Sequence, residues 1–216
     1  MKARILVWLV ALFCCHNALF AQKEFVNASA RLSGHPRILL QKGEEKALKK
    51  VIMKDAVWKD IHQSLVDEAE EIVKLPLNER IKTGRRLLSV SRENLRRIFI
   101  LSYAYRMTGK SEFLKRAESE MLKAASFSDW NPSHFLDVGE MTMALAIGYD
   151  WLYPQLSVQT KEAIEKAIVE KGLKPSFDER YNWFVNAVHN WSQVCHAGVT
   201  YGALAIWEKE PELSRT

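Results

Sequence analysis

Two kinds of helical pattern alternate along the chain from residue 42 onward. Residues 56–74, 111–127 and 157–172 place apolar side chains at helical spacing along one side and charged side chains opposite. In the first of these segments the apolar stripe consists of Trp58, Ile61, Leu65, Ala69 and Ile72. In the third, Ser157 is a suitable N-cap and Gly172 a suitable C-terminal stop. Strand-like alternation is almost absent, so the pattern predicts an all-α protein.

Three segments between the amphipathic ones, residues 93–109, 136–153 and 191–207, are apolar almost all round after their first turns. A helix that is apolar on every side must be surrounded by other elements. The alternation therefore favours helical hairpins with the apolar helices inside and the amphipathic helices outside, as in an incomplete (α/α) toroid. A helical solenoid and a simple bundle are the alternative arrangements.

The first 21 residues have a different character. Lys2 and Arg4 precede an uncharged run, residues 5–13, and small residues follow near Ala21. This is the layout of a secretory signal peptide, and the run is short for a membrane span. We therefore expect export to the periplasm, the cell surface or the medium, with no membrane span. An extended arm over residues 22–41 and a toroid portion over residues 42–216 should follow.

Composition and charge narrow the function. The chain is 48% apolar and 26% charged, which is typical of a globular protein. Loss of Lys2 and Arg4 with the signal peptide lowers the formal net charge from +5 to +3 and leaves Cys195 as the only cysteine. This charge is compatible with an anionic ligand. No basic run is interleaved with aromatic residues, so we expect no nucleic-acid partner.

The stretch NAVHNWSQVCHAG, residues 186–198, opens one of the apolar helices with a polar but uncharged cluster. Its histidines, His189 and His196, are seven residues apart, and no HExxH motif is present, so we expect no metal. Asn190 or Ser192 is a suitable helix cap, with Trp191 as an anchor in the core. A catalytic polar group that faces a cavity is the alternative.

A second polar group, His134, Asp137 and Glu140, shares one helical face if the helix begins at Pro132 with Asn131 as its cap. Three polar side chains on an otherwise apolar helix would need water or a ligand. Acidic residues are, however, also favoured in a first turn by the helix dipole. Asp150, near the end of the same helix, should be structural.

Two further motifs contain basic residues. His35, Pro36 and Arg37 precede a short apolar run, which we expect to be an edge strand or an extended arm that anchors the chain. The second motif holds five arginines, which either bind carboxylates or sulfates or form a solvated helix face. These are Arg85, Arg86, Arg92, Arg96 and Arg97.

Four stretches together point to a known family. In order, HPRILL follows the signal peptide, YDWLYPQLS closes one apolar helix, HNWSQVCHAG opens the next and GALAIWEKEPE ends it. In their order and spacing the chain resembles the N-terminal part of the heparinase II/III family of polysaccharide lyases. The resemblance implies an N-terminal (α/α) toroid followed by β domains. It also implies β-elimination on uronate-containing polysaccharides, and we expect no cofactor.

The resemblance also implies roles for particular residues. His189, with Asn190 beside it, matches the position that neutralises the uronate carboxylate as the carbanion develops. Ser192 stands where some relatives have an acidic residue, and Tyr201 does not match the family's catalytic tyrosine. That tyrosine and a second histidine lie further downstream in the family, so we expect this truncated chain to be inactive alone. The same cleft should be lined by Trp191, His134, Asp137, Glu140 and Arg92 as substrate-binding residues.

Other functions and partners are also open. A glycoside hydrolase on a similar toroid would use paired carboxylates, for which Asp137, Glu140 and Asp150 are the candidates. A non-catalytic helical module would bind a glycan or another protein. In every case the exposed apolar helices of an incomplete toroid should promote association between copies of the chain.

Overall fold

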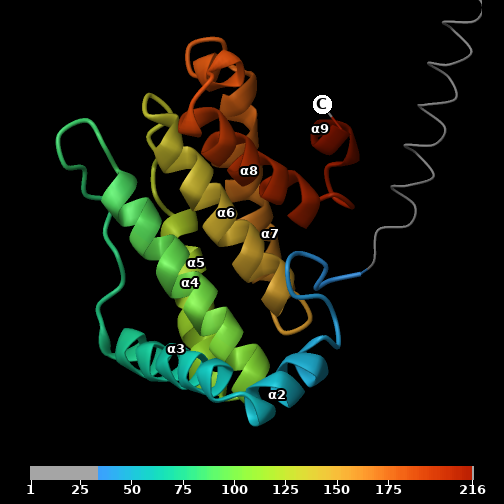
Figure 1. Cartoon of the computed structure of the whole chain (residues 1–216). Coiled ribbons are helices and arrows are strands. Elements are labelled where there is room, and N and C mark those ends of the chain that lie inside the picture. The colour runs from blue at the N-terminus through green and yellow to red at the C-terminus, as the bar shows by residue number, and fades with distance from the viewer. Residues whose placement is uncertain (1–33, 216) are drawn as a thin grey trace, which may run out of the picture. The chain divides into compact units, whose positions relative to one another are not determined.

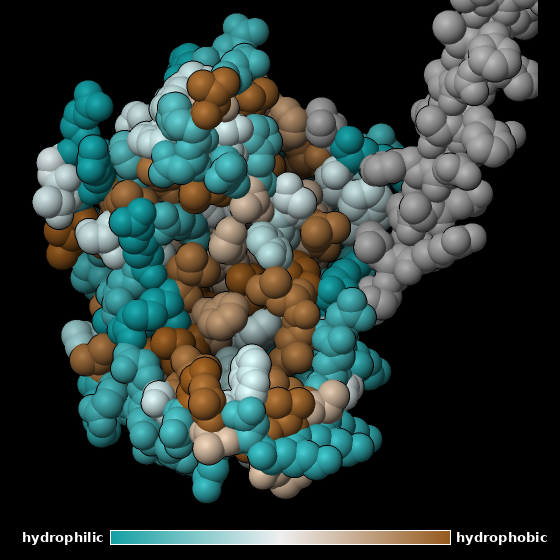
Figure 2. Space-filling model, viewed as in Figure 1, coloured by the Kyte–Doolittle hydropathy of each residue, from teal (hydrophilic) through white to brown (hydrophobic). Residues whose placement is uncertain are grey.

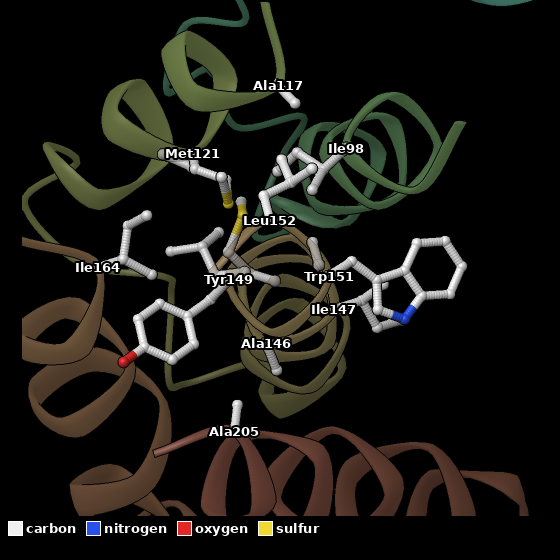
Figure 3. Close-up of a cluster of buried hydrophobic side chains, with 14 of the residues drawn as sticks. Ile98, Ala117, Met121, Ala146, Ile147, Tyr149, Trp151, Leu152, Ile164 and Ala205 are labelled. Atoms are coloured by element: carbon white, nitrogen blue, oxygen red, sulfur yellow. The ribbon is translucent and has the colours of Figure 1, made fainter. Parts of the chain in front are cut away.

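Helix α6, Phe135–Leu152, lies at the centre of the molecule and contacts four other helices. The computed structural model describes residues 34–215, and its helices all belong to one compact unit that begins at His35. Every residue of α6 except Met143 is buried. Figure 3 shows its side chains enclosed by those of α4, α5, α7 and α8. The prediction that this apolar helix is surrounded is therefore confirmed.

The described residues form helices and no strand, which confirms the all-α prediction. A π-helical turn, Ile168–Leu173, continues α7, and short 3-10 helices at Lys174–Phe177 and Asn182–Asn186 lead to α8. The other helices besides α6 are α2 (Glu45–Lys54), α3 (Ala56–Lys74), α4 (Leu88–Thr108), α5 (Ser111–Ala125), α7 (Val158–Ala167), α8 (Asn190–Ala205) and α9 (Pro211–Arg215).

The helices α4, α6 and α8 form one layer, with α5 and α7 behind it (Figure 1). Helix α3 packs against α4 and α5. All three helices of the first layer begin at the same end. Two contacts between their starts show this: the backbone N–H of Leu87, before α4, donates to Asp137 of α6, and the ring of His134, before α6, contacts that of Trp191 of α8. The chain therefore forms successive helical hairpins in which the helices of the first layer run in the same direction.

Local sequence signals explain most helix ends. The Asp55 carboxylate caps α3, and the Ser157 hydroxyl caps α7 by accepting from the N–H of Thr160, as predicted. Gly109 ends α4 in the left-handed region, at φ 76°. Gly172 does not stop its helix, because it lies inside the π-helical turn. A Cβ atom there would come within 2.6 Å of Thr142 Oγ1, so close packing on α6 explains this glycine.

Two burial predictions are wrong. Trp58 and Ile61, expected on the buried stripe of α3, are each 47% exposed, because the burial of this helix is confined to its second half. Helix α8 was expected to be enclosed on every side, but within the described chain it buries one narrow stripe. That stripe consists of Cys195, Gly198, Gly202 and Ala205.

The buried stripe of α8 lets its backbone approach that of α6 closely. A Cβ atom on Gly198 would lie 2.1 Å from the carbonyl oxygen of Gly139, which is too close for any side chain. Only glycine allows this crossing. It brings the first turns of α6 and α8 together at the end of the layer where their polar residues lie.

The chain before α2 is an anchor and not a strand. Asp150 accepts hydrogen bonds from His35 Nδ1 at 2.6 Å and from the backbone N–H groups of Arg37 and Ile38. Trp151 Nε1 donates to the carbonyl oxygen of Ile38 at 2.7 Å. The predicted anchor and the structural role of Asp150 are confirmed. The expected signal peptide, residues 1–21, and the arm up to residue 33 lie outside the described residues.

Hydrophobic side chains gather in the middle of the face that α4 and α6 present, with hydrophilic side chains around them (Figure 2). Phe99 of α4 and Trp151 of α6 pack together with ring centroids 5.1 Å apart. Among residues 34–215, no helix combines the length and apolar character needed to cross a bilayer.

Candidate functional site

Side chains from the N-terminal ends of α4, α6 and α8 meet at one end of the first layer. Arg92 belongs to α4, His134, Asp137 and Glu140 to the start of α6, and Trp191 to the first turn of α8. We call this cluster the N-terminal site. It brings together all five residues that the sequence analysis assigned to substrate binding.

His134 and Asp137 form the buried core of the N-terminal site. His134 Nδ1 donates to Asp137 Oδ1 at 2.6 Å, and the two side chains are 8% and 0% exposed. Asp137 Oδ2 accepts from the backbone N–H of Leu87 and from Asn131 Nδ2, both at 2.6 Å. The carboxylate thus holds the imidazole in the tautomer with the proton on Nδ1, which leaves the lone pair on Nε2.

The start of α6 differs from the prediction. The helix begins at Phe135 with His134 at the N-cap position, and not at Pro132. Asn131 has a left-handed backbone, φ 61°, and its side chain donates to Asp137 and to the carbonyl oxygen of Arg85. This polar residue therefore positions the site, a role that the sequence analysis missed. The carboxylate of Asp137 was expected to need water or a ligand as a partner. Three donors of the protein itself take that role.

Glu140 is paired with Arg92 at the edge of the cluster. Arg92 Nε donates to both carboxylate oxygens at 3.1 Å, and its side chain is 63% exposed. Burial raises the pKa of Glu140 above its usual value, although the hydrogen bond from Arg92 acts in the opposite direction. The guanidinium has its Nη groups free for an anionic ligand, since only Nε bonds to Glu140 among the described residues.

Cys195 lies beside this carboxylate but is not placed for chemistry. Burial, followed by the charge of Glu140, raises the pKa of the Cys195 thiol to about 12. A thiol of that pKa stays protonated at neutral pH, and the thiolate is the form that attacks or binds metal. His196, the adjacent residue, bonds instead to Ser192 of its own helix. In residues 34–215 no three His, Cys, Asp or Glu side chains are placed to share a metal ion.

His189 and Asn190, the predicted catalytic pair, lie at the exposed rim of the site. His189 is itself the N-cap of α8, where Asn190 or Ser192 was predicted, and its Nδ1 accepts from the N–H of Trp191 at 3.4 Å. The ring of Trp191 contacts that of His134 at a centroid distance of 4.6 Å. His189 is therefore linked to the buried pair through Trp191.

A second tryptophan extends this rim. Trp183 is 47% exposed, and its ring centroid lies 4.7 Å from that of Trp191 and 6.0 Å from that of His189. Nothing in the hydrophobic pattern assigned Trp183 to the site. The feature that could have identified Trp183 is its position: it is an aromatic residue in a stretch without helical spacing, just before the polar stretch 186–198. An exposed ring of this kind offers a flat surface against which a sugar ring can stack.

The five arginines separate into three groups. Arg96 and Arg97 pair with Glu93 of their own helix, and Arg97 also donates to the buried Glu120, so both are structural. Arg85 and Arg86 are exposed in the loop before α4. Only Arg92 joins the N-terminal site directly.

A cavity of about 420 Å³ lies at the opposite end of α6. Tyr105, Arg106 and Trp151 form part of its lining, and Arg106 is held by Glu45. None of the predicted site residues lines it.

Comparison with known proteins adds no identification. No model of a protein family matches the chain, and no curated protein matches it significantly. Any inference about function therefore depends on the geometry of the N-terminal site and on the four sequence stretches.

Proposed function

We propose that this protein binds a uronate-containing polysaccharide at the N-terminal site, as the N-terminal part of a lyase of the heparinase II/III type. The observation that supports this best is the convergence of three helix N-termini on Arg92 and on the pair of His134 and Asp137. Helix N-termini carry partial positive charge and free N–H groups, and they favour anionic ligands. A uronate carboxylate has this chemistry.

The electrostatics of the acidic residues are compatible with such a ligand. Asp137 is fully buried behind His134, and its oxygens are occupied by three donors. The pairing of Glu140 with Arg92 reduces the repulsion that a second carboxylate would meet. The exposed groups that remain are the guanidinium of Arg92 and the rim residue His189.

In an elimination reaction the protein must offset the uronate charge and move a proton from C5. His189, at the exposed N-cap, is our candidate for the first task, with Asn190 beside it. His134 is a candidate for the second, because Asp137 holds its Nδ1 proton and leaves Nε2 able to accept one. The tyrosine and second histidine of the family are not matched in residues 1–216, so we propose binding without turnover by this chain alone.

The hydrolase alternative has less support. Such an enzyme needs two carboxyl groups about 5–10 Å apart across the sugar. Asp150 lies thirteen residues beyond Asp137, which is about 20 Å along a helix. Asp150 is also fully occupied by the arm. That leaves Asp137, which is buried, and Glu140, which is paired with Arg92.

The proposal extends to the architecture, the partner surface and the location. Parallel helices in one layer with return helices behind them are the arrangement of an (α/α) toroid, of which we propose these hairpins are a section. The hydrophobic face of α4 and α6 supports association between copies, which sedimentation at several concentrations would detect. Export through residues 1–21 completes this picture, and N-terminal sequencing of the mature protein tests it.

Binding of an oligouronate hexasaccharide and its carboxyl-reduced form, measured by calorimetry, tests the proposed function. We expect the oligouronate to bind more tightly, and His189→Ala to weaken it by about tenfold. His196→Ala is the matched control, because His196 is also exposed on α8 but bonds to Ser192. Equal binding of the two sugars would contradict the proposal. Ultraviolet absorbance by an unsaturated product would show that the chain alone also catalyses elimination.

A further inference from the structure

The loop before α4 is attached to the N-terminal site by its backbone and by one side chain. The N–H of Thr83 donates to the carbonyl oxygen of Arg86 at 2.8 Å, and the reverse bond is 3.1 Å, so residues 83–86 form a closed turn. Asn131 Nδ2 donates to the carbonyl oxygen of Arg85 at 2.8 Å. Lys82 Nζ donates to Asn131 Oδ1 at 3.1 Å. The same Asn131 also bonds to Asp137, so the loop has a fixed position beside the site.

This turn contains cations that the protein does not neutralise. Arg85 and Arg86 are exposed, and neither forms an ion pair in the part of the chain that the structure describes. The acidic groups around the site are taken by other cations: Asp129 by Arg80 and Glu140 by Arg92. Every other arginine of residues 34–215 pairs with an Asp or Glu, namely Arg37, Arg80, Arg92, Arg96, Arg97, Arg106, Arg116, Arg180 and Arg215.

Two neighbouring guanidinium groups on a fixed turn form a surface for an oxyanion. Each guanidinium presents a planar fork of donors that matches the oxygens of a carboxylate or sulfate. Because the backbone of the turn is already closed, a ligand has to order only the side chains. No aromatic residue lies within residues 82–86, so the loop lacks the stacking surface that single-stranded nucleic acid requires.

The loop continues a line of contacts that starts at the aromatic rim. Trp183 contacts Trp191, and Trp191 contacts His134. His134 bonds to Asp137, which accepts from the same Asn131 that holds the turn. The aromatic rim and the turn are therefore both attached to the buried pair, so a polymer bound at the rim can extend over this pair toward the arginines.

We propose that residues 82–86, the basic loop, bind a second acidic group of the polysaccharide, a carboxylate or sulfate on a sugar next to the one at the N-terminal site. This inference rests on the proposed function and deepens it, because it assigns the ligand more than one anionic group. The basic loop contributes affinity and salt dependence, and it takes no part in proton transfer.

The test compares two double variants of equal charge. Arg85→Gln with Arg86→Gln removes the paired forks and leaves the backbone acceptor of residue 85 in place. Lys49→Gln with Lys50→Gln removes two exposed cations from α2, which contacts the opposite end of α4 through Glu45 and Arg106. Calorimetric Kd values are measured at two salt concentrations for an alginate hexasaccharide, which carries only carboxylates, and a heparin hexasaccharide, which also carries sulfates.

We expect the arginine variant to bind about tenfold more weakly with a reduced salt dependence, and the lysine variant to bind within about twofold of the wild type. A larger loss with heparin assigns the loop to sulfate, and a larger loss with alginate assigns it to carboxylate. Equal losses in both variants would overturn the proposal, since they would indicate bulk charge alone. Tighter binding of a single-stranded oligonucleotide than of either sugar would also overturn it.

The outcome separates the two proposals. If the wild type binds neither sugar, the proposed function fails and the basic loop has no polysaccharide to bind. If the wild type binds and the arginine variant binds equally well, the function stands and the loop proposal is wrong. Circular dichroism and the melting temperature of both variants establish that each is folded.

Discussion

Replacement of Gly198 with alanine should force α6 and α8 apart and weaken both the fold and the N-terminal site. The added Cβ atom would lie 2.1 Å from the oxygen, 2.6 Å from the carbonyl carbon and 2.7 Å from the Cα of Gly139. These are backbone atoms of a buried helix, so no side chain can move aside to make room. One of the two helices has to shift.

The size of the effect follows from two opposing terms. Alanine in place of glycine inside a helix gains about 1 kcal/mol from backbone propensity. Overpacking of a close contact costs about 3 kcal/mol or more when backbone has to move. We therefore expect a net loss of about 2–3 kcal/mol in the free energy of unfolding. For a domain of this size that lowers the melting temperature by roughly 4–12 °C.

Urea denaturation followed by circular dichroism measures this loss, and two further variants calibrate it. Gly139→Ala places its Cβ 3.2 Å from the Cα of Cys195, a tight contact that a small adjustment relieves, so its cost should be under about 1 kcal/mol. Thr200→Ala, at an exposed position of α8, reports propensity alone. If Gly198→Ala is as stable as Thr200→Ala, the close crossing of α6 and α8 is wrong.

Three further predictions concern titratable side chains. Asp150→Ala should cost about 3–5 kcal/mol by denaturant unfolding, because the buried donors of the arm lose their acceptor; a loss below 1 kcal/mol would refute the anchor. The hydrogen bond from Arg96, and after it that from Arg97, lowers the pKa of Glu93 from 4.5 to about 2. The ionised carboxylate therefore stabilises the folded state above pH 4.5, and this stabilisation is lost as the pH falls toward 2. For this partly exposed group the stabilisation amounts to about 1–2 kcal/mol in the free energy of unfolding. Glu93→Gln should abolish this loss of stability between pH 4.5 and pH 2 in denaturant unfolding. In a variant without the other two cysteines, Cys195 should react with a thiol reagent at pH 8 only after unfolding, because its thiol is buried and stays protonated. Rapid labelling of the folded protein would contradict this burial.

The helical class and the central helix were predicted well from the sequence, because a helix that is buried on every side has almost no charged residues. The nearly uncharged run over residues 136–153 corresponds to α6, and the hydroxyl of Ser157 caps α7 as its spacing indicated. Asp150 was recognised as structural for a similar reason, since an acid near the end of an apolar helix requires a partner.

The errors occur where a long-range contact overrides a local signal. The local spacing favoured Pro132 as the start of α6, but Asn131 adopts a left-handed backbone so that it can bond to the loop before α4. Trp58 and Ile61 have the spacing of a buried stripe, yet burial depends on which neighbours pack there, and spacing does not reveal that. The partners of the site residues were not predictable for the same reason, since Leu87 and Asp137 are fifty positions apart.

Asp137 connects the fold to the chemistry of the N-terminal site, because its two carboxylate oxygens bond to different groups. Oδ2 accepts from the N–H of Leu87 and from Asn131, and so fixes the start of α4 and the basic loop, whereas Oδ1 accepts from His134. Asp137→Asn would keep its oxygen in the Oδ2 position, where two donors require an acceptor, and would turn its NH₂ group toward His134 Nδ1. The imidazole would then carry its proton on Nε2 and could no longer accept one there. Nitrogen NMR of the His134 ring would detect the change of tautomer. A tautomer unchanged from the wild type would show that Asp137 serves the fold alone.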